Sequence, residues 1–303
     1  MKISAIVTTY NSESVIRRTI ESIRSQKREE IDFDMEIIVV DDCSSDATME
    51  IVRSYDDLIF LQNATNSGGP NRGRNIGLKK STGDYICIVD HDDEWLPFKI
   101  STQLRYAELA KIVTSNYYHI DILKNKKNER GNISEQAFVF HPANETFLNK
   151  LSKNKKGEMA YIGSILFHKS LKSNLFEKEF GMIDYDWLLR LFKNNSSVEI
   201  TKALYNRYFD GTNLSLNETY RKNDYLFSSK TIALLYEKEY PEFATRSIKR
   251  INGSMARYYY LMGNMPLARS FFCKSEKNVK MFLYYFTTFA GSSFVKKHFN
   301  VFG

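Results

Sequence analysis

The first 120 residues alternate between short runs that are apolar throughout and longer stretches with apolar residues at helical spacing. Between the first two runs, for example, Ile16, Ile20 and Ile23 fall on one helical stripe. Strands that are apolar on both faces and alternate with helices predict an α/β fold, with a mostly parallel sheet flanked by helices. The runs that predict strands are residues 3–10, 35–42, 58–63, 84–90 and 111–120.

The rest of the chain has a different pattern. Residues 121–158 are polar and charged, which predicts loops over the sheet edge or a flap. Apolar runs return at 158–168 and 198–211 as expected strands, on either side of an amphipathic helix at 184–195. From about Asn223 helices dominate. Gly263 and Pro266 then predict a helix–turn–helix pair.

The net charge of +7 is concentrated at the C-terminal end. Residues 244–303 contain ten Lys/Arg, a single acid (Glu276) and 13 Phe/Tyr. A basic, aromatic segment suits an anionic membrane surface or a nucleic acid, and exposed aromatics suit a homodimer contact. The alternative is an ordinary helical subdomain with a solvated basic face. We favour the membrane surface, and we expect no nucleic-acid partner.

The cysteines and the N-terminus indicate the compartment. Cys43, Cys87 and Cys273 are far apart and show neither metal-ligand spacing nor a disulfide framework, which favours a reducing compartment. The apolar run at the N-terminus is too short for a signal peptide, and no run of about 18 apolar residues predicts a membrane span. We therefore expect a cytoplasmic protein, peripheral on the inner membrane if its C-terminal region binds lipid.

Polar residues gather where the predicted strands end. Thr8, Thr9 and Tyr10 follow the first strand, Asp41 and Asp42 end the second, and Asp90, Asp92 and Asp93 follow the fourth. In parallel sheets ligands bind at the carboxyl ends of the strands. We therefore expect these residues to form one site, although about 80 positions separate them.

Two of these polar stretches, and a glycine-rich loop between them, suit a nucleotide ligand. Asp90 and Asp92, separated by His91, can share Mg²⁺ or Mn²⁺ with phosphate oxygens, although an acidic turn that caps the next helix is the alternative. Asp41 and Asp42 can accept hydrogen bonds from a base or ribose, or cap a helix. The loop "SGGPNRGRNIG" offers backbone amides, a helix N-terminus and two arginines to phosphate, or is a solvated turn.

Taken together, "IVTTYN", "VVDDCSSDAT", "GGPNRGRNIG" and "VDHDDEWLP" resemble, in chain order, the family 2 glycosyltransferases of the GT-A fold. The resemblance covers about residues 1–215. It implies a nucleotide-sugar half at about 1–110, an acceptor half at about 111–215 and a helical extension at 216–303. Two positions differ from the family pattern, with Cys43 where glycine is usual and Gly73 in place of alanine.

The resemblance also implies roles for individual residues. Asp92 becomes the main metal ligand with Asp90 beside it, Asp93 lies near the acceptor side, and Asp42 or Asp41 contacts the uracil. The remaining nucleotide-sugar contacts implied by the matching stretches are Thr8, Thr9, Tyr10, Gly69, Arg72, Arg74, Asn75 and His91.

The family's inverting reaction needs a general base, which is an Asp at a helix start with an Arg six positions later. Asp184 and Arg190 have this spacing, although Ile183 replaces the usual Glu, and Asp186 is the second candidate. Phe209 stands where the family often has a metal-proximal His, so a third protein ligand to the metal is not identified.

The resemblance implies a metal-dependent transferase that moves a sugar from a nucleotide donor, expected to be UDP-linked, to a glycan or lipid-linked acceptor in bacterial surface polysaccharide, lipooligosaccharide or capsule synthesis. Two alternatives remain. A sugar nucleotidyltransferase should carry a Gly-rich, Lys-containing loop directly after the first strand, where "TTYNSES" stands instead. A non-catalytic sugar-nucleotide-binding protein is the other.

Overall fold

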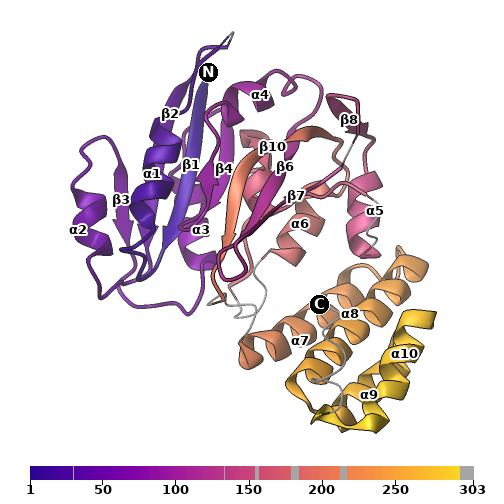
Figure 1. Ribbon diagram of the computed structural model, residues 1–303. Helices are drawn as coiled ribbons and strands as arrows, with labels where there is room; N and C mark the ends of the chain where they lie inside the picture. Colours follow the sequence, from indigo (N-terminus) through magenta and orange to yellow (C-terminus); the bar gives the residue numbers. More distant parts are fainter. Residues whose placement is uncertain (30, 133, 154–156, 179–183, 212–216, 294–303) are drawn as a thin grey trace. The chain divides into compact units, whose positions relative to one another are not determined.

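The computed structural model describes residues 1–29, 31–132, 134–153, 157–178, 184–211 and 217–293 (Figure 1). The chain divides into two compact units. The first, here the sheet unit, comprises residues 1–147 and 156–216, and the second, the helical unit, comprises 148–155 and 217–303. The domain boundary predicted at residues 215/216 lies outside the described residues.

The sheet unit is built on one twisted sheet with the strand order β3-β2-β1-β4-β9-β6-β10-β5 (Figure 1). β1 pairs in parallel with β2 and β4, β2 with β3, and β6 with β10, whereas β5, β7, β8 and β9 pair antiparallel. The predicted α/β class with a mostly parallel sheet is confirmed. The strands are β1 (Lys2–Thr9), β2 (Asp34–Asp41), β3 (Ile59–Gln62), β4 (Tyr85–Asp90), β5 (Glu94–Trp95), β6 (Ile112–Asp121), β7 (Lys126–Arg130), β8 (Phe138–His141), β9 (Leu166–His168) and β10 (Ser197–Phe209).

Both faces of β1 are covered, which explains why its centre, Ala5–Val7, is apolar and why the polar Ser4 and Thr8 are also buried. Ile3, Ala5 and Val7 belong to the same core cluster as the buried stripe of α1. On the opposite face Gly77 of α3 lies so close to Ile6 that an added Cβ would come within 2.2 Å of its Cγ2. The helices of this unit are α1 (Ile16–Arg24), α2 (Thr48–Arg53), α3 (Asn71–Lys80), α4 (Lys99–Leu104), α5 (Glu145–Leu151, which crosses the unit boundary) and α6 (Tyr185–Phe192).

The prediction of loops or a flap over residues 121–158 is wrong in part, because β7, β8 and α5 lie within this segment. All five residues of β7 are exposed, so its strand form comes from hydrogen bonding to β6 and leaves no apolar signal. The strand predicted over 158–168 is also mostly wrong. Only Leu166–His168 form a strand, after a short 3₁₀ turn at Ile162–Ser164.

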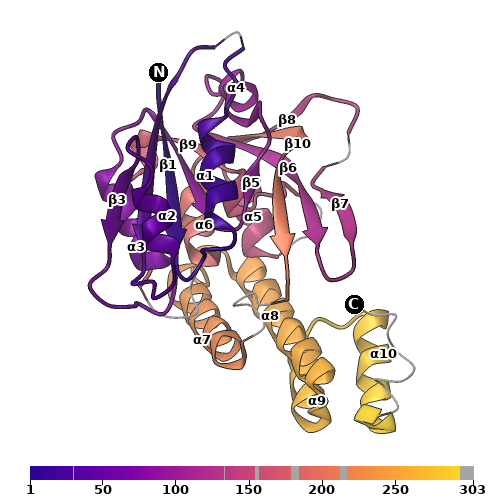
Figure 2. The same ribbon diagram turned by 60° about the vertical axis from the view of Figure 1, so that its left-hand side comes forward.

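The helical unit contains α7 (Glu218–Leu235), α8 (Pro241–Met262), α9 (Met265–Lys274) and α10 (Val279–Thr287), so its first helix begins earlier than the expected Asn223 (Figure 2). The helix–turn–helix is confirmed, since Gly263 ends α8 with a φ of 84° and Pro266 lies in the first turn of α9. None of the described helices is both long and apolar enough to span a bilayer.

A buried charged cluster joins β8 to β10 inside the sheet unit. His141 Nε2 lies 3.2 Å from Glu199 Oε2, and its Nδ1 lies 3.0 Å from Glu145 Oε1. Burial alone would lower the pKa of His141, but the hydrogen bonds to Glu199 and Glu145 outweigh it and raise this pKa to about 9. The protonated imidazole therefore holds an edge strand to the neighbouring β10.

This cluster predicts a loss of stability at alkaline pH. The pKa of His141 is higher in the folded chain than the value of about 6.5 in an unfolded one, so its contribution is complete below about pH 6.5 and declines as the pH rises through 9. His141→Gln should cost about 1–3 kcal/mol in the free energy of unfolding at pH 6 and little at pH 9.5. Denaturant titrations of both proteins at the two pH values measure this difference, and an equal cost at both would contradict the assignment.

Candidate active site

The structure brings the predicted polar residues of three strands to one edge of the sheet. β1 lies between β2 and β4, and in its register Thr8 is opposite Asp90 and Thr9 is opposite Asp41. The expected convergence of the strand ends is therefore confirmed. The site is built where three parallel strands stop and their polar loops begin.

Arg74 and Asp90 form the buried ion pair of this edge. Arg74 Nη2 donates to Asp90 Oδ1 at 2.7 Å, and the arginine side chain is 2% exposed whereas that of Asp90 is 24% exposed. Burial would raise the pKa of Asp90, but the Arg74 guanidinium outweighs it, so this pKa is lowered and the carboxylate stays charged. Asn71, one turn before Arg74 on α3, accepts a second bond from the guanidinium.

Side chains of α1 bind the turn that contains Asp92 and Asp93. Thr19 Oγ1 donates to the carbonyls of His91 and Asp93 at 2.6 and 2.7 Å, and Arg18 donates to the carbonyl of Asp92 at 2.8 Å. The helix thus binds the turn through its backbone carbonyls. Asp92 and His91 are half-buried.

At Asp92 and Asp93, burial and the neighbouring acids outweigh the nearby positive charges. Burial, together with the neighbouring Asp90, raises the pKa of Asp92, although His91 opposes this. Asp93 is buried, and burial with the two other aspartates raises its pKa well above the usual range. Its Oδ2 faces Gly163, where an added Cβ would come within 2.7 Å. A cation or a further hydrogen-bond donor at this edge would therefore stabilise the charged form of these carboxylates.

Asp41, the last residue of β2, and Asp42, which follows it, both bind within the protein. Asp41 accepts from the backbone and hydroxyl of Ser44 at 2.9 and 2.5 Å. Asp42 accepts from Asn63 at 2.5 Å and from the backbone and hydroxyl of Ser67 at 2.9 and 3.0 Å. Neither caps α2, which begins at Thr48 without a side-chain cap. Asp42 instead ties the strand end to the loop before α3.

Cys43 adopts a left-handed backbone, with a φ of 68°. This conformation favours glycine, which accounts physically for the glycine that the family pattern has at this position. The chain therefore has a non-glycine residue in a left-handed backbone conformation that glycine adopts more easily.

The remaining predicted nucleotide contacts occupy different environments. Tyr10 is 45% exposed beyond the end of β1, and Arg72 is exposed on the first turn of α3. Gly69 is half-buried, with open space where a side chain would be. Asn75 is buried, and its amide binds both the N–H and the carbonyl of Phe176 at 2.7 and 2.8 Å. In this structure Asn75 therefore joins α3 to the segment before α6.

The two candidate bases differ in environment. Asp184 is half-buried at the N-cap position of α6, and its side chain makes no cap hydrogen bond. Asp186 is buried and accepts from Arg190 Nε and Nη2 at 2.9 and 2.6 Å. Asp186 thus forms an ion pair within α6. Burial, with Asp90, Asp93 and Asp184 in turn, raises the pKa of Tyr161, so the charge of Asp184 acts on the same tyrosine as the aspartates of the turn. Ile183 lies outside the described residues.

Arg207 on β10 is the site residue that the sequence reasoning missed. Its guanidinium lies 4.3 Å from the centroid of the Tyr161 ring. Burial would lower the pKa of Arg207, but Tyr161 and Asp93 raise it, so the group stays charged. It acts electrostatically on Asp90, Asp92 and Asp93 alike.

The sequence contains a pattern that could have pointed to Arg207, because side chains at every second position of a strand share one face. Tyr205, Arg207 and Phe209 recur at every second position of β10, so they belong to one face of the strand. The resemblance drew attention to Phe209, whose ring lies 6.0 Å from that of His119, instead of to the cation two positions earlier.

Several buried polar atoms around these residues lack a hydrogen-bond partner. They include Thr9 Oγ1, Arg74 Nε, Asp93 Oδ2 and the Tyr205 hydroxyl. Buried polar groups in folded proteins are nearly always paired, and unpaired ones need a specific explanation. The unpaired atoms at the end of β1, on α3 and in the turn after β4 are available to a polar ligand at this edge of the sheet.

The acids can be tested for a divalent cation. Among the described residues no group of three or more His, Cys, Asp or Glu side chains is arranged as a complete metal site. Mg²⁺ and Mn²⁺ accept one or two carboxylates when substrate phosphates and water supply the other oxygens. Asp90 and Asp92, both partly exposed, fit a cation of this kind.

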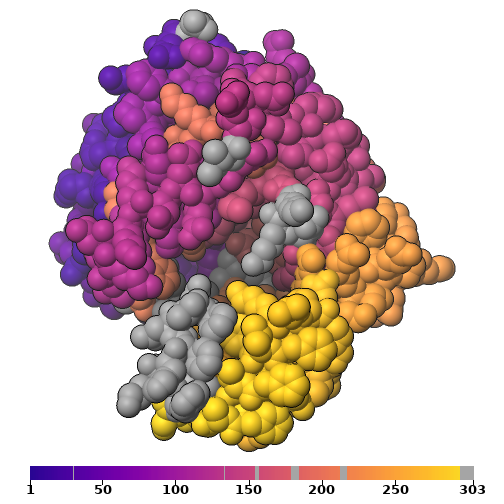
Figure 3. Space-filling view, turned by 45° about the vertical axis from the view of Figure 1, so that its right-hand side comes forward, coloured from indigo at the N-terminus to yellow at the C-terminus, as the bar shows by residue number. Residues whose placement is uncertain are grey.

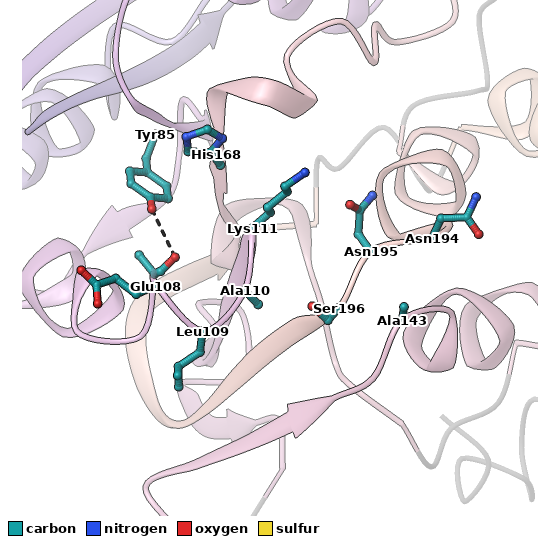
Figure 4. A pocket seen from close by; sticks show the side chains of 11 residues that line it. Tyr85, Glu108, Leu109, Ala110, Lys111, Ala143, His168, Asn194, Asn195 and Ser196 are labelled. Atoms are coloured by element: carbon teal, nitrogen blue, oxygen red, sulfur yellow. Dashed lines mark hydrogen bonds between the residues drawn. The ribbon is translucent and has the colours of Figure 1, made fainter.

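A cavity of about 500 Å³ lies elsewhere in the sheet unit (Figure 4). It is lined by residues at the amino ends of β4, β6 and β10, including Tyr85, Lys111 and Ser196. The Tyr85 hydroxyl donates to the carbonyl of Ala107 across its wall. The aspartates lie at the opposite ends of these strands, so this cavity is not part of the site.

Residues 4–176 match the family described as "Glycosyl transferase family 2". The chain belongs to this family. The match includes the aspartates of β2 and β4 and the arginine of α3, and it ends before α6 and β10.

Curated relatives share parts of this family 2 chain. Over 96 residues it is 45% identical to the poly(ribitol-phosphate) beta-N-acetylglucosaminyltransferase TarS of Staphylococcus aureus strain Mu50, covering 31% of this chain but only 16% of the relative. Over 206 residues it is 32% identical to the GalNAc(5)-diNAcBac-PP-undecaprenol beta-1,3-glucosyltransferase of Campylobacter jejuni, covering 64% and 61%. The chain thus aligns with a small part of TarS and with less than two thirds of the second relative.

The same fold is found in a solved structure of residues 1–349 of S. aureus TarS in complex with UDP-GlcNAc. The TM-score is 0.64 at 20% identity, covering 96% of this chain and 88% of the other. At this identity the likeness shows the fold alone. It agrees with the GT-A fold that the family implies.

Proposed function

We propose that this family 2 chain is an inverting glycosyltransferase that moves a sugar from a UDP-linked donor to a glycan or lipid-linked acceptor of bacterial surface-glycan synthesis. The observation that carries the proposal is the register of β1, which sets Thr9 beside Asp41 and Thr8 beside Asp90, with Arg74 paired to Asp90. The relatives named above, one of them a transferase to a PP-undecaprenol substrate and one solved with UDP-GlcNAc, support the donor and acceptor classes.

The donor occupies the carboxyl edge in this proposal. Asp42 and Asp41 receive the base, with Thr9 and Tyr10 beside them. Arg74 and Arg207 face the sugar diphosphate as fixed positive charges that require no reorganisation when the leaving group departs. The unpaired Arg74 Nε and Asp93 Oδ2 are the buried atoms that such a ligand would satisfy.

The reaction follows from the charges that face the site. Asp184 takes the proton from the acceptor hydroxyl, the oxygen attacks the anomeric carbon, and the bond from that carbon to the diphosphate breaks on the opposite side. The electron pair leaves with the diphosphate, so configuration inverts and no enzyme intermediate forms. Mn²⁺ or Mg²⁺ held by Asp92 and Asp90 would supply further positive charge to the departing diphosphate.

A donor panel tests this function directly. Release of nucleoside diphosphate from UDP-, GDP- and dTDP-sugars would be measured with Mn²⁺, with Mg²⁺ and with EDTA, for the wild type, Asp92→Ala and Asp184→Ala. We expect metal-dependent release from a UDP-sugar that falls by about 10²-fold or more in both variants.

Binding of UDP provides the second readout. UDP with Mn²⁺ should raise the melting temperature of the wild type and of Asp184→Ala, and should do so less in Asp92→Ala. Turnover without any effect of EDTA would remove the metal from the proposal. A chain that neither turns over any donor nor is stabilised by UDP would refute the transferase.

The rival functions predict other results. A non-catalytic sugar-nucleotide-binding protein would be stabilised by UDP without turnover in the presence of acceptor. A sugar nucleotidyltransferase would consume a nucleoside triphosphate, but β1 runs directly into "TTYNSES", without a glycine-rich phosphate loop.

A further inference from the structure

Helix α10 of the helical unit has two apolar faces on opposite sides. Met281 and Tyr284 point inward, belong to the core cluster of this unit, and are 8% and 4% exposed. Val279, Phe282, Leu283 and Phe286, with Phe289 in the turn that follows, recur at three- and four-residue spacing on the other side. We call these five residues the outer face of α10.

The outer face is exposed to an extent that is unusual for large apolar side chains. Its residues are 49–77% exposed, with Val279 the most and Phe282 the least. Single exposed apolar residues are common on proteins, but a contiguous aromatic and aliphatic face marks an interaction surface. The end of the described chain, drawn in yellow, forms a broad part of the surface in Figure 3.

The charges around this face are almost all positive. Lys274, Lys277 and Lys280 are exposed, and α10 itself contains no acid. The only acid in residues 244–303, Glu276, accepts from Arg250 Nε at 3.0 Å. The face is therefore an apolar strip bordered by lysines whose charge is not locally compensated.

We propose that the outer face of α10 binds an anionic lipid bilayer, with Phe282 and Phe286 in the acyl boundary and Lys277 and Lys280 at the headgroups. Helices with aromatic and aliphatic residues on one side and lysines beside them bind membrane surfaces in this way. The lysines add electrostatic attraction to anionic lipids, at short range from the surface.

Two other occupants fit the face less well. A symmetric contact with a second copy would bring the same lysines together across the interface, and like charges there oppose association. A nucleic acid would meet Val279 and Leu283, whereas its interfaces are polar and dominated by phosphate contacts. The bilayer is the partner that matches both the apolar strip and the charge.

The purpose of this contact rests on the proposed function, because a lipid-linked acceptor is presented at a membrane surface. The outer face of α10 also narrows the prediction that residues 244–303 bind an anionic membrane surface to one helix of that segment. Residue 244 lies inside α8, so deleting everything after it would remove a folded helical unit along with any lipid contact. Point substitutions on α10 separate the two effects.

Flotation of the full chain with vesicles tests the proposal. Vesicles would contain either phosphatidylglycerol with phosphatidylethanolamine or phosphatidylcholine alone. We expect the wild type to float with the anionic vesicles, and the double variant Phe282→Ser/Phe286→Ser to bind them about tenfold more weakly or worse. Lys277→Glu/Lys280→Glu should lose binding to the anionic vesicles in particular.

Matched controls distinguish this face from general hydrophobicity or charge. Leu226→Ser/Leu234→Ser removes two side chains of α7 that are 59% and 71% exposed, and should float as the wild type does. Lys79→Glu/Lys80→Glu changes two exposed lysines of the sheet unit and should also float normally. Equal flotation of the α10 and α7 double variants would overturn the proposal.

Two further measurements separate the remaining outcomes. If the wild type does not float and the α10 variant alone changes from dimer to monomer in light scattering, the face is a contact between copies and the lipid proposal fails. Stabilisation by UDP and donor turnover, both measured without vesicles, report the proposed function independently. If the α10 double variant no longer floats but is still stabilised by UDP and still turns over the donor, the lipid contact is identified. If the wild type floats but shows neither UDP stabilisation nor turnover, only the transferase is refuted.

Discussion

Asp184→Asn is expected to lower kcat by about 10²–10⁴-fold while leaving the affinity for the UDP-sugar donor unchanged. Asp184 lies half-buried at the start of α6, without a side-chain cap bond, and its charge acts on Tyr161 near Asp90 and Asp93. An amide keeps the shape of the side chain but cannot accept the acceptor's proton. Steady-state turnover with acceptor and donor binding by calorimetry measure the two quantities.

Asp186→Asn is the matched comparison two positions later on the same helix. Asp186 is buried in a two-bond ion pair with Arg190, so the substitution should cost about 1–3 kcal/mol of stability and lower the melting temperature. If Asp186→Asn abolished turnover in a folded protein while Asp184→Asn did not, the base would be reassigned to Asp186.

Arg207→Met should lower kcat by about 10²–10³-fold, which is the usual cost of removing one fixed donor that stabilises charge in the transition state. Arg207 is a charged group that lies 4.3 Å from the Tyr161 ring and acts on all three aspartates of the turn. Methionine retains much of the aliphatic length but removes the guanidinium, with its charge and its N–H donors. Turnover of the donor identified by the panel, with kcat and KM measured separately, tests this result.

Arg207→Lys and Arg17→Met complete the comparison. Lysine keeps the charge but loses the planar contact with Tyr161, so it should restore part of kcat. Arg17 is exposed on α1, and its removal should leave kcat unchanged. A fall in stability with no fall in kcat for Arg207→Met would mean that Arg207 supports the tyrosine cluster and does not face the leaving group.

The strand ends of the donor half could be predicted because both faces of a central parallel strand are buried. Ile3, Ala5 and Val7 belong to the core cluster that includes α1 while Ile6 packs against α3, so β1 is mostly apolar on both faces until Thr8. The polar residues that follow then mark the carboxyl edge directly. This is why Thr9, Asp41 and Asp90 could be placed together before their register was known.

The acceptor half was harder to predict for the converse reason. β7 is fully exposed and is held by its backbone pairing with β6, which leaves no apolar pattern to recognise. β9 has only three residues between longer strands. Edge and insertion strands of this kind depend on partners distant in sequence, so local propensity does not identify them.

The sequence by itself determined the α/β class, the carboxyl edge of the donor half and the family, since these depend on local periodicity and on residues next to one another in the chain. Only the tertiary structure decided how the charges are paired: Arg74 with Asp90, Asp186 with Arg190, and Arg207 facing the aspartates from β10. It also decided which side of α10 is buried. The physical reason is that the strength of a charge, or the exposure of a face, depends on desolvation and on neighbours brought from distant parts of the chain.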